Sequence, residues 1–144
     1  MTCTILTEFR REGERTAAVE IIPAVLQVIP EMLWQSTHVE ATERIVSGLE
    51  CLDRYEMTAR DPSGKLIGFS SAAEDSDDHV GPVLGVQWLF VTEDQRGAAG
   101  FRLRKAVYSL AEQLGYRVLA YTHRLGEGRY ELTYKRLRPR SDNG

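Results

Sequence analysis

The chain has 144 residues and a mass of 16.3 kDa, which is enough for one ordinary domain and too little for two separate cores. A composition of 42% hydrophobic and 27% charged residues argues against disorder, collagen-like repeats and a coiled coil. No apolar run approaches the roughly 20 residues of a membrane span, and the N-terminus does not resemble a signal peptide. We therefore expect a cytoplasmic protein with no membrane partner.

Charge is divided unevenly along the chain. Residues 1–94 hold 17 acidic and 7 basic side chains, whereas residues 95–140 hold 3 acidic and 11 basic ones, a net charge of −10 against +8. This asymmetry predicts either an anionic ligand at the C-terminal half and a cationic partner at the N-terminal half, or mutual neutralisation in the fold. Cys3 and Cys51 are far apart and lack CxxC spacing, which indicates neither a metal site nor a disulfide.

The N-terminal half predicts a strand, two helices and a hairpin. Residues 2–9 alternate as in an edge strand, and apolar residues then recur at threes and fours within residues 16–52. Pro30 ends or kinks the first helix, and residues 35–37 supply a cap for the second. Residues 55–60 and 65–72 predict an antiparallel pair, followed by a solvated acidic loop at residues 74–78.

The C-terminal half predicts a strand, helix, strand unit and a closing strand. Residues 83–91 are almost continuously apolar, as in a central strand covered on both faces. An amphipathic helix ends at Gly115, and residues 116–122 predict a parallel strand reached by a right-handed crossover. A turn at Gly126 and Gly128 leads into a strand over residues 130–137. We expect one domain over residues 1–138 and a flexible tail over residues 139–144.

Small residues connect the apolar strand to the amphipathic helix, in the run Gln-Arg-Gly-Ala-Ala-Gly at residues 95–100. Unpaired amides in the first turn of a helix, aided by its dipole, bind phosphate groups. Four cationic side chains surround this position in the sequence: Arg96, Arg102, Arg104 and Lys105. The pattern predicts an anion-binding site, the alternative being a tight turn that merely requires small residues.

The segment from Val86 to Gly100 resembles the central motif of the GNAT acyltransferases, Gln/Arg-x-x-Gly-x-Gly/Ala after the fourth strand. The order of elements is similar to that family over about residues 2–122. The resemblance implies a mixed α/β fold with a twisted, mostly antiparallel sheet flanked by helices. It also implies that acetyl-coenzyme A is the co-substrate, with its pyrophosphate on the motif amides and its pantetheine along the preceding strand end. The implied coenzyme-binding residues are Leu89, Phe90, Val91, Gln95, Arg96, Gly97, Ala98, Ala99 and Gly100.

Three features depart from the family pattern. Ala98 stands where the family normally has a glycine, and its Cβ narrows the room at the phosphate. The fourth strand offers Gln87 where the family commonly has a catalytic glutamate, and an amide cannot act as a base. A hairpin replaces the fourth helix, which usually carries a tyrosine that protonates the thiolate. This short ending is similar to small GNAT-like proteins of tailed bacteriophages, for which the location would be the host cytoplasm.

The resemblance implies transfer of an acetyl group from acetyl-coenzyme A to an amine of a small molecule or a protein. Candidates for proton transfer are Tyr121, His123 and Tyr130. The alternative for each tyrosine is packing within its strand, and the alternative for His123 is an exposed position at the end of its strand. Trp34 and Trp88 are candidates for an acceptor pocket, although Trp88, in an apolar strand, is more typical of the core.

The alternative function is that of a GNAT-fold binding or virion-associated protein that has lost catalysis, which the three departures permit. A homodimer is compatible with either function. A nucleic-acid partner is not expected, because the basic run over residues 135–140 lacks interleaved aromatic residues and the chain is acidic overall.

Overall fold

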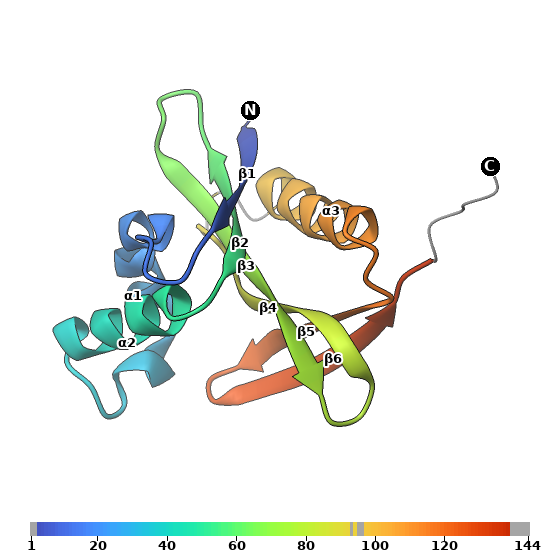
Figure 1. Cartoon of the computed structure of the whole chain (residues 1–144). Helices are drawn as coiled ribbons and strands as arrows, with labels where there is room; N and C mark the ends of the chain where they lie inside the picture. The colour runs from blue at the N-terminus through green and yellow to red at the C-terminus, as the bar shows by residue number, and fades with distance from the viewer. Residues whose placement is uncertain (1–2, 93, 95–96, 139–144) are drawn as a thin grey trace.

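The computed structural model describes residues 3–92, 94 and 97–138. These residues form a six-stranded sheet in the order β1-β2-β3-β4-β5-β6, with helices on both faces (Figure 1). Neighbouring strands are antiparallel except β4 and β5, which are parallel. The predicted mixed α/β architecture, with one parallel pair in a mostly antiparallel sheet, is confirmed.

The elements follow one another in the predicted order. The strands are β1 (Thr4–Arg10), β2 (Arg54–Arg60), β3 (Leu66–Asp77), β4 (Gly81–Val91), β5 (Val118–Gly126) and β6 (Arg129–Arg136). The helices are α1 (Ile22–Val28), α2 (His38–Glu50) and α3 (Ala98–Gln113), with short 3-10 turns η1 (Ala17–Glu20) and η2 (Pro30–Leu33) around α1.

Local sequence signals set the helix boundaries. Thr37 caps α2 in a capping box, in which its hydroxyl accepts from the Glu40 amide and the Glu40 carboxylate accepts from the Thr37 amide. Pro30 begins η2 after α1 has ended, as its missing amide donor predicts. Gly115 follows α3 with a φ of 81°, a left-handed conformation that favours glycine.

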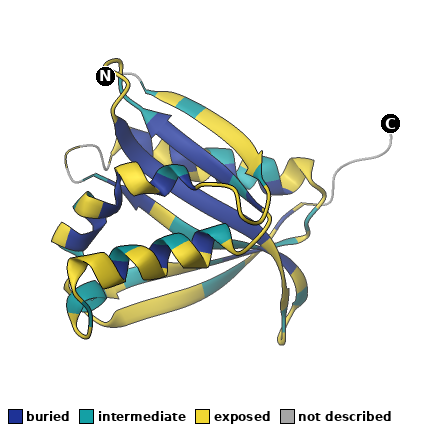
Figure 2. Ribbon diagram, turned by 60° about the vertical axis from the view of Figure 1, so that its left-hand side comes forward, coloured by how far each residue is buried: buried dark blue, intermediate teal, exposed yellow. Residues whose placement is uncertain are grey.

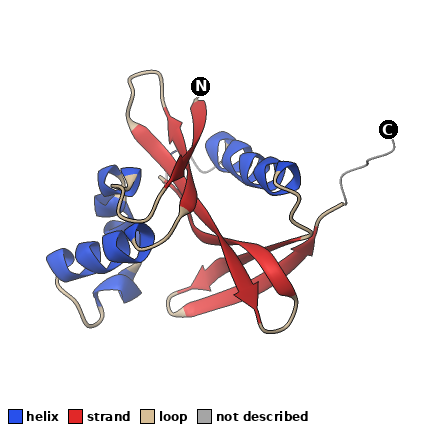
Figure 3. Cartoon of the chain, in the orientation of Figure 1, coloured by secondary structure: helices blue, strands red, loops and turns tan. Residues whose placement is uncertain are grey.

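The core lies in two layers, one on each face of the sheet (Figure 3). On one face, Leu103 and Val107 of α3 pack against β2, β3 and β4. On the other, α1 and α2 bury an apolar stripe that includes Ile22 and Leu49, and Figure 2 shows the strands between the two layers as buried. Val19 lies in the segment predicted to be helical but is 53% exposed, because a 3-10 turn places residues at a different angular spacing from an α-helix.

The acidic segment was predicted to be a loop, and this is wrong for most of its length. β3 continues to Asp77, and residues 74–77 pair with residues 81–84 of β4. Backbone pairing with an apolar neighbour strand extends the ladder, and Glu74 and Asp75 remain exposed within it. The β3–β4 hairpin is therefore longer than the sequence pattern indicates.

One buried ion pair fastens the β1–η1 loop to the sheet. Arg54 Nε donates to Glu56 Oε2 at 2.8 Å, and both side chains are almost completely buried. The remaining Arg54 nitrogens donate to the carbonyls of Arg11, Leu52 and Glu14. Glu56 Oε1 accepts from the backbone amide of residue 17. Because every charged atom has a partner, the pair orders the loop in front of η1.

Candidate functional site

The two parallel strands pair over only two positions, Leu84 with Leu119 and Gly85 with Ala120. Beyond these positions β4 and β5 continue but diverge, so that an opening forms toward their C-terminal ends (Figure 1). Within residues 86–91 and 121–126, all of which the structure describes, the facing backbone edges have no partner strand in the sheet. Unpaired amides and carbonyls of this kind are available to a ligand that lies between the strands.

A bulge in β4 lies where the opening begins. Ser71 of β3 pairs with Trp88 and Ala72 pairs with Val86, which leaves Gln87 as an extra residue in β4. The Ser71 hydroxyl donates to Gln87 Oε1 at 2.8 Å and so fixes this side chain. A bulge turns the backbone locally and re-aims its polar groups, and this one follows the last β4 residue that pairs with β5.

The N-terminus of α3 presents small residues beside the end of β4. Gly97 is the N-cap, and the first hydrogen bond within the helix runs from the Phe101 amide to the Gly97 carbonyl. Gly97 and Ala98 are exposed. The helix terminus that the motif predicts as an anion site therefore begins at the surface of the protein.

The predicted coenzyme-binding residues fall into three groups. Ala99 and Gly100 are buried, and a Cβ added to Gly100 would meet Val91 Cγ2 at 3.7 Å, so the Cα of Gly100 faces the sheet. Phe90 and Val91 are buried on opposite faces of β4, whereas Leu89 is 38% exposed. Gln95 and Arg96 lie outside the described residues.

The cationic side chains predicted near the motif point in different directions. Arg102 Nη1 donates to the carbonyl of Cys3, which ties α3 to the start of β1. Arg104 and Lys105 are exposed on the helix. Arg102 therefore has a structural partner, and Arg104 and Lys105 are the described cations on α3 that remain accessible to an anionic ligand.

The three predicted proton-transfer residues do not form one cluster. Tyr121 is half-buried against the α3 layer, where it forms a hydrogen bond with Tyr108. Burial and, to a smaller extent, this hydrogen bond raise the pKa of Tyr108. His123 is exposed on β5 and pairs in register with Glu131. The Tyr130 hydroxyl points to the α1 side and donates to Glu31 Oε2 at 2.7 Å. Tyr121 and His123 lie two residues apart on the same face of β5, whereas Tyr130 pairs with Arg124 and lies on the other face.

A cavity of about 310 Å³ lies at the root of the opening, lined by β3, β4, β5 and β6. Its lining includes the bulge residue Gln87 together with Glu74, Asp75 and Asp77. A Cβ on Gly85 would lie 3.8 Å from Asp75 Cβ, so Asp75 projects beside the last β4 residue that pairs with β5. These acidic residues were not predicted as site residues, because their polar sequence resembles a loop.

The carboxylates of the cavity differ in their partners. Asp77 accepts from the Tyr134 hydroxyl at 2.8 Å and from the amides of His79 and Val80. These hydrogen bonds, the one from Tyr134 above all, hold the pKa of Asp77 below its ordinary value. Among the described residues, Asp75 accepts only a local bond, from the neighbouring amide of residue 76. Asp77 thus shapes the hairpin, while Asp75 faces the cavity.

A clasp joins η2 to the tip of the β5–β6 hairpin across one side of the sheet. Glu31 accepts two hydrogen bonds from Arg124, at 2.8 and 2.9 Å, and further ones from the Gly128 amide and Tyr130. Beside it, Trp34 Nε1 donates to Glu127 at 3.2 Å. These contacts connect segments almost 100 residues apart and hold the β5 side of the opening in place.

The clasp predicts a pH dependence of stability. The hydrogen bonds from Arg124, against the opposing effect of burial, hold the pKa of Glu31 far below its ordinary value, and those from Tyr130 and Gly128 lower it further. A carboxyl whose pKa is lowered by folding stabilises the protein above its unfolded pKa, and this contribution declines as the pH falls below that value. The melting temperature of Glu31→Gln should be several degrees below that of the wild type near neutral pH.

The difference in free energy of unfolding between wild type and Glu31→Gln should then shrink as the pH falls from about 6 to about 3, around the ordinary carboxyl pKa. Urea denaturation at several pH values measures it. Glu43→Gln, at an exposed position of α2, is the control and should change little. A difference that stays constant over this range contradicts the ionised clasp.

The described part of the chain contains neither a candidate metal-binding cluster nor a candidate membrane-spanning helix. No group of three or more His, Cys, Asp or Glu residues could hold a metal ion there. No helix among these residues is long and apolar enough to cross a membrane.

Comparisons with known proteins support the fold. No protein-family model and no curated protein matches the chain, but solved structures do. An acetyl transferase from Pyrococcus furiosus superposes with a TM-score of 0.66 at 16% identity, over 88% of this chain and 86% of that one. The GNAT protein YhbS from Escherichia coli, solved in complex with CoA, superposes with a TM-score of 0.55 at 16% identity, over 84% of this chain and 63% of that one.

A third match is the GCN5-related glucosamine N-acetyltransferase region of a fungal multi-domain β-N-acetylglucosaminidase. It superposes with a TM-score of 0.62 at 18% identity over 89% of this chain, which spans only 14% of that protein. At these identities the comparisons establish architecture, and they agree with the strand order and the parallel pair described above. The chain therefore has the fold of the GCN5-related N-acetyltransferases, the GNAT fold.

Proposed function

We propose that this chain is an N-acetyltransferase that transfers an acetyl group from acetyl-coenzyme A to an amine, and that it acts as a homodimer. The observation that carries the proposal is the opening between β4 and β5, which adjoins the N-terminus of α3, where Gly97 and Ala98 are exposed. A strand edge and a helix terminus suit the two parts of the donor, its amide-rich pantetheine and its anionic pyrophosphate.

The amides at Gly97, Ala98 and Ala99 are proposed to hold the pyrophosphate, together with Gln95 and Arg96 of the motif. The β4 edge at Leu89, Phe90 and Val91 is proposed to pair with the pantetheine. The E. coli neighbour that contains CoA has the same fold, which supports a donor of this type.

The reaction requires few side chains. The amine nitrogen attacks the thioester carbonyl carbon, the C–S bond breaks, and the thiolate leaves with a proton gained from the site or from solvent. A β4 amide at the bulge is proposed to stabilise the oxyanion of the intermediate. Because the fold presents both substrates to one opening, positioning accounts for much of the expected rate enhancement.

Cationic amines are the proposed acceptors, as small molecules or as part of a protein. The cavity at the root of the opening holds Glu74, Asp75 and Asp77, and the N-terminal half of the chain is strongly acidic. Asp75 is proposed to attract the protonated amine and to accept the proton that it loses before attack.

Asp75→Asn should lower kcat/KM for a cationic acceptor such as spermidine by at least about tenfold, mainly because the attraction and the proton acceptor are both lost. Affinity for acetyl-coenzyme A should not change. Asp78→Asn, which removes the same charge from the neighbouring hairpin turn, is the matched control. Equal rates for Asp75→Asn and wild type would remove Asp75 from the mechanism.

Release of the coenzyme thiol in the presence of acetyl-coenzyme A and a panel of amines tests the proposed activity. Amine-dependent release above the rate of thioester hydrolysis is the expected result. Coenzyme binding without release for any small amine or peptide amine would instead favour the catalytically inactive, GNAT-fold binding protein. Ala98 at the motif and the absence of a carboxylate on β4 are the features compatible with that second function.

A further inference from the structure

The last strand of the sheet is an unprotected edge. β6 pairs with β5 on one side, and no described strand pairs with its other side. Most of its side chains are exposed, including Tyr130 and Leu132 at about half of their surface. An edge of this length presents a row of backbone donors and acceptors that can pair with another chain.

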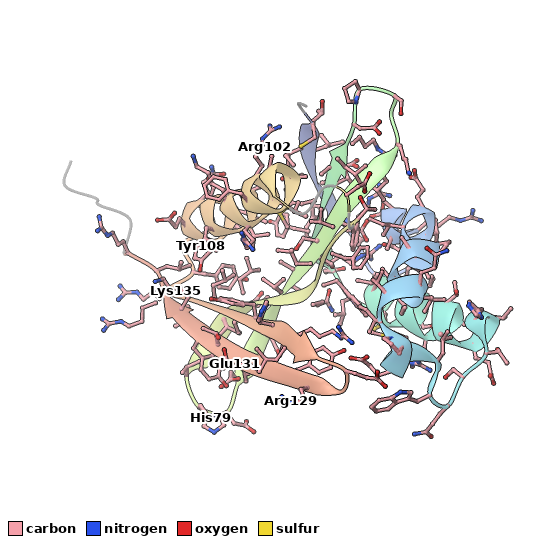
Figure 4. The ribbon with its side chains drawn as sticks, turned by 180° about the vertical axis from the view of Figure 1, so that it is seen from behind. His79, Arg102, Tyr108, Arg129, Glu131 and Lys135 are labelled. Carbon is pink, nitrogen blue, oxygen red and sulfur yellow. The ribbon has the colours of Figure 1, made fainter. Side chains whose placement is uncertain are left out.

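The two faces of β6 carry different side chains. One face holds Arg129, Glu131, Thr133 and Lys135, and the other holds Tyr130, Leu132, Tyr134 and Arg136. Figure 4 shows Arg129, Glu131 and Lys135 spread along this strand. The charges on the first face alternate in sign along the strand, in the order positive, negative and positive.

This charge order is complementary to itself in one antiparallel register. Around a two-fold axis perpendicular to the sheet, residues on the same face lie opposite one another. With the axis at Thr133, Glu131 of each copy lies opposite Lys135 of the other. Two attractive cross-strand pairs form, one on each side of the axis.

The neighbouring registers lack this match. An axis at Leu132 places Arg129 opposite Lys135, so that two like-charge pairs replace the two attractive ones. An axis at Tyr134 places Glu131 opposite Leu137. The register centred on Thr133 also pairs Leu132 with Tyr134 on the other face, which covers part of the exposed apolar surface of β6.

We propose that two copies of this chain associate through β6, antiparallel and centred on Thr133, to form one continuous sheet. The partner is a second copy because the strand complements its own sequence in both charge and length. The partner strand would lie beside the β5–β6 hairpin, which the clasp at Glu31 already holds against η2.

The opposite edge of the sheet does not offer the same match. β1 carries Glu8 and Arg10, and these two side chains already bind one another, with Arg10 also donating to the Arg15 carbonyl. An axis that placed Glu8 opposite Arg10 of a second copy would lie at Phe9, near the end of the strand. Only residues 8–10 of β1 would then overlap, so β6 is the edge on which a stable pairing can form.

The test exchanges charges across the proposed axis and measures mass by size-exclusion chromatography with light scattering. Wild type should have twice the 16.3 kDa of one chain. Lys135→Glu and Glu131→Lys should each weaken self-association by at least about tenfold, because each places like charges opposite one another twice. The double variant, with both charges exchanged, should dimerise like wild type.

Self-association in an equimolar mixture of the two single variants is the decisive measurement. Each variant repels itself, but Glu131→Lys complements Lys135→Glu at both positions, so the mixture should form heterodimers. Dimerisation in the mixture also shows that both variants are folded. The proposal is overturned if wild type remains monomeric up to millimolar concentration, if the single variants dimerise as wild type does, or if the mixture does not associate.

Discussion

Ala98→Glu should abolish measurable binding of coenzyme A, with an affinity at least about 100-fold below wild type, or about 2.8 kcal/mol. Ala98 is the first residue of α3 and is exposed at the N-terminus of the helix. A carboxylate at this position would occupy the place proposed for the pyrophosphate and repel it, and like charges brought together in a binding site cost several kcal/mol.

The substitution leaves the fold intact, because glutamate is a good helix former and a negative charge is favourable in the first turn. Gln113→Glu adds the same charge at the other end of α3, where it is exposed and remote from the motif, and serves as the control. Titration calorimetry of both variants with coenzyme A makes the comparison. Wild-type affinity in Ala98→Glu would show that the pyrophosphate does not lie at this helix terminus.

Glu56→Gln should lower the free energy of unfolding by about 3–5 kcal/mol, the range expected when one partner of a buried ion pair is removed. Glu56 and Arg54 are among the largest fully buried side chains of the protein. Without the Glu56 carboxylate, the Arg54 guanidinium keeps its carbonyl partners but loses its counter-ion. The resulting uncompensated charge lies beneath the loop that leads to η1.

A second Glu–Arg pair of the same protein provides the control. Glu20 binds Arg60 through two bonds of 2.7 Å, but the two side chains are partly exposed, at 47% and 35% of their surface respectively. Glu20→Gln should therefore cost less than about 1 kcal/mol. Urea denaturation of the two variants measures the contrast, and equal losses would contradict the role assigned to burial.

Much of the fold follows from periodicity and turn chemistry. The apolar run at β4, the amphipathic pattern of α3 and the glycine that follows it specify a crossover unit, because each pattern fits only one type of element. The capping box at Thr37 and the turn at residues 61–64 also have local signatures. These elements were predictable because neighbouring residues determine them.

The site was predictable only in part. The motif between β4 and α3 indicates an anion-binding turn, but the early divergence of β4 from β5 depends on sheet twist and on the bulge at Gln87, which have no local signal. The polar composition of residues 74–77 resembles a loop, although pairing with β4 makes them a strand. Asp75 was therefore overlooked as a site residue.

Long-range contacts had no signal in the sequence. Glu31 and Arg124 are 93 residues apart, and nothing near either residue indicates that they meet. Their pair joins the acidic half of the chain to the basic half, as the neutralisation hypothesis predicts. The other four ion pairs of the described residues lie within the N-terminal half.

Calorimetric titration of the purified protein with acetyl-coenzyme A tests the central claim most directly, with desulfo-coenzyme A as the donor that cannot react. The proposed site predicts a Kd on the order of 1 µM, about −8 kcal/mol, for both ligands. The absence of detectable binding at millimolar ligand would contradict an acyl-coenzyme A site at the β4–β5 opening.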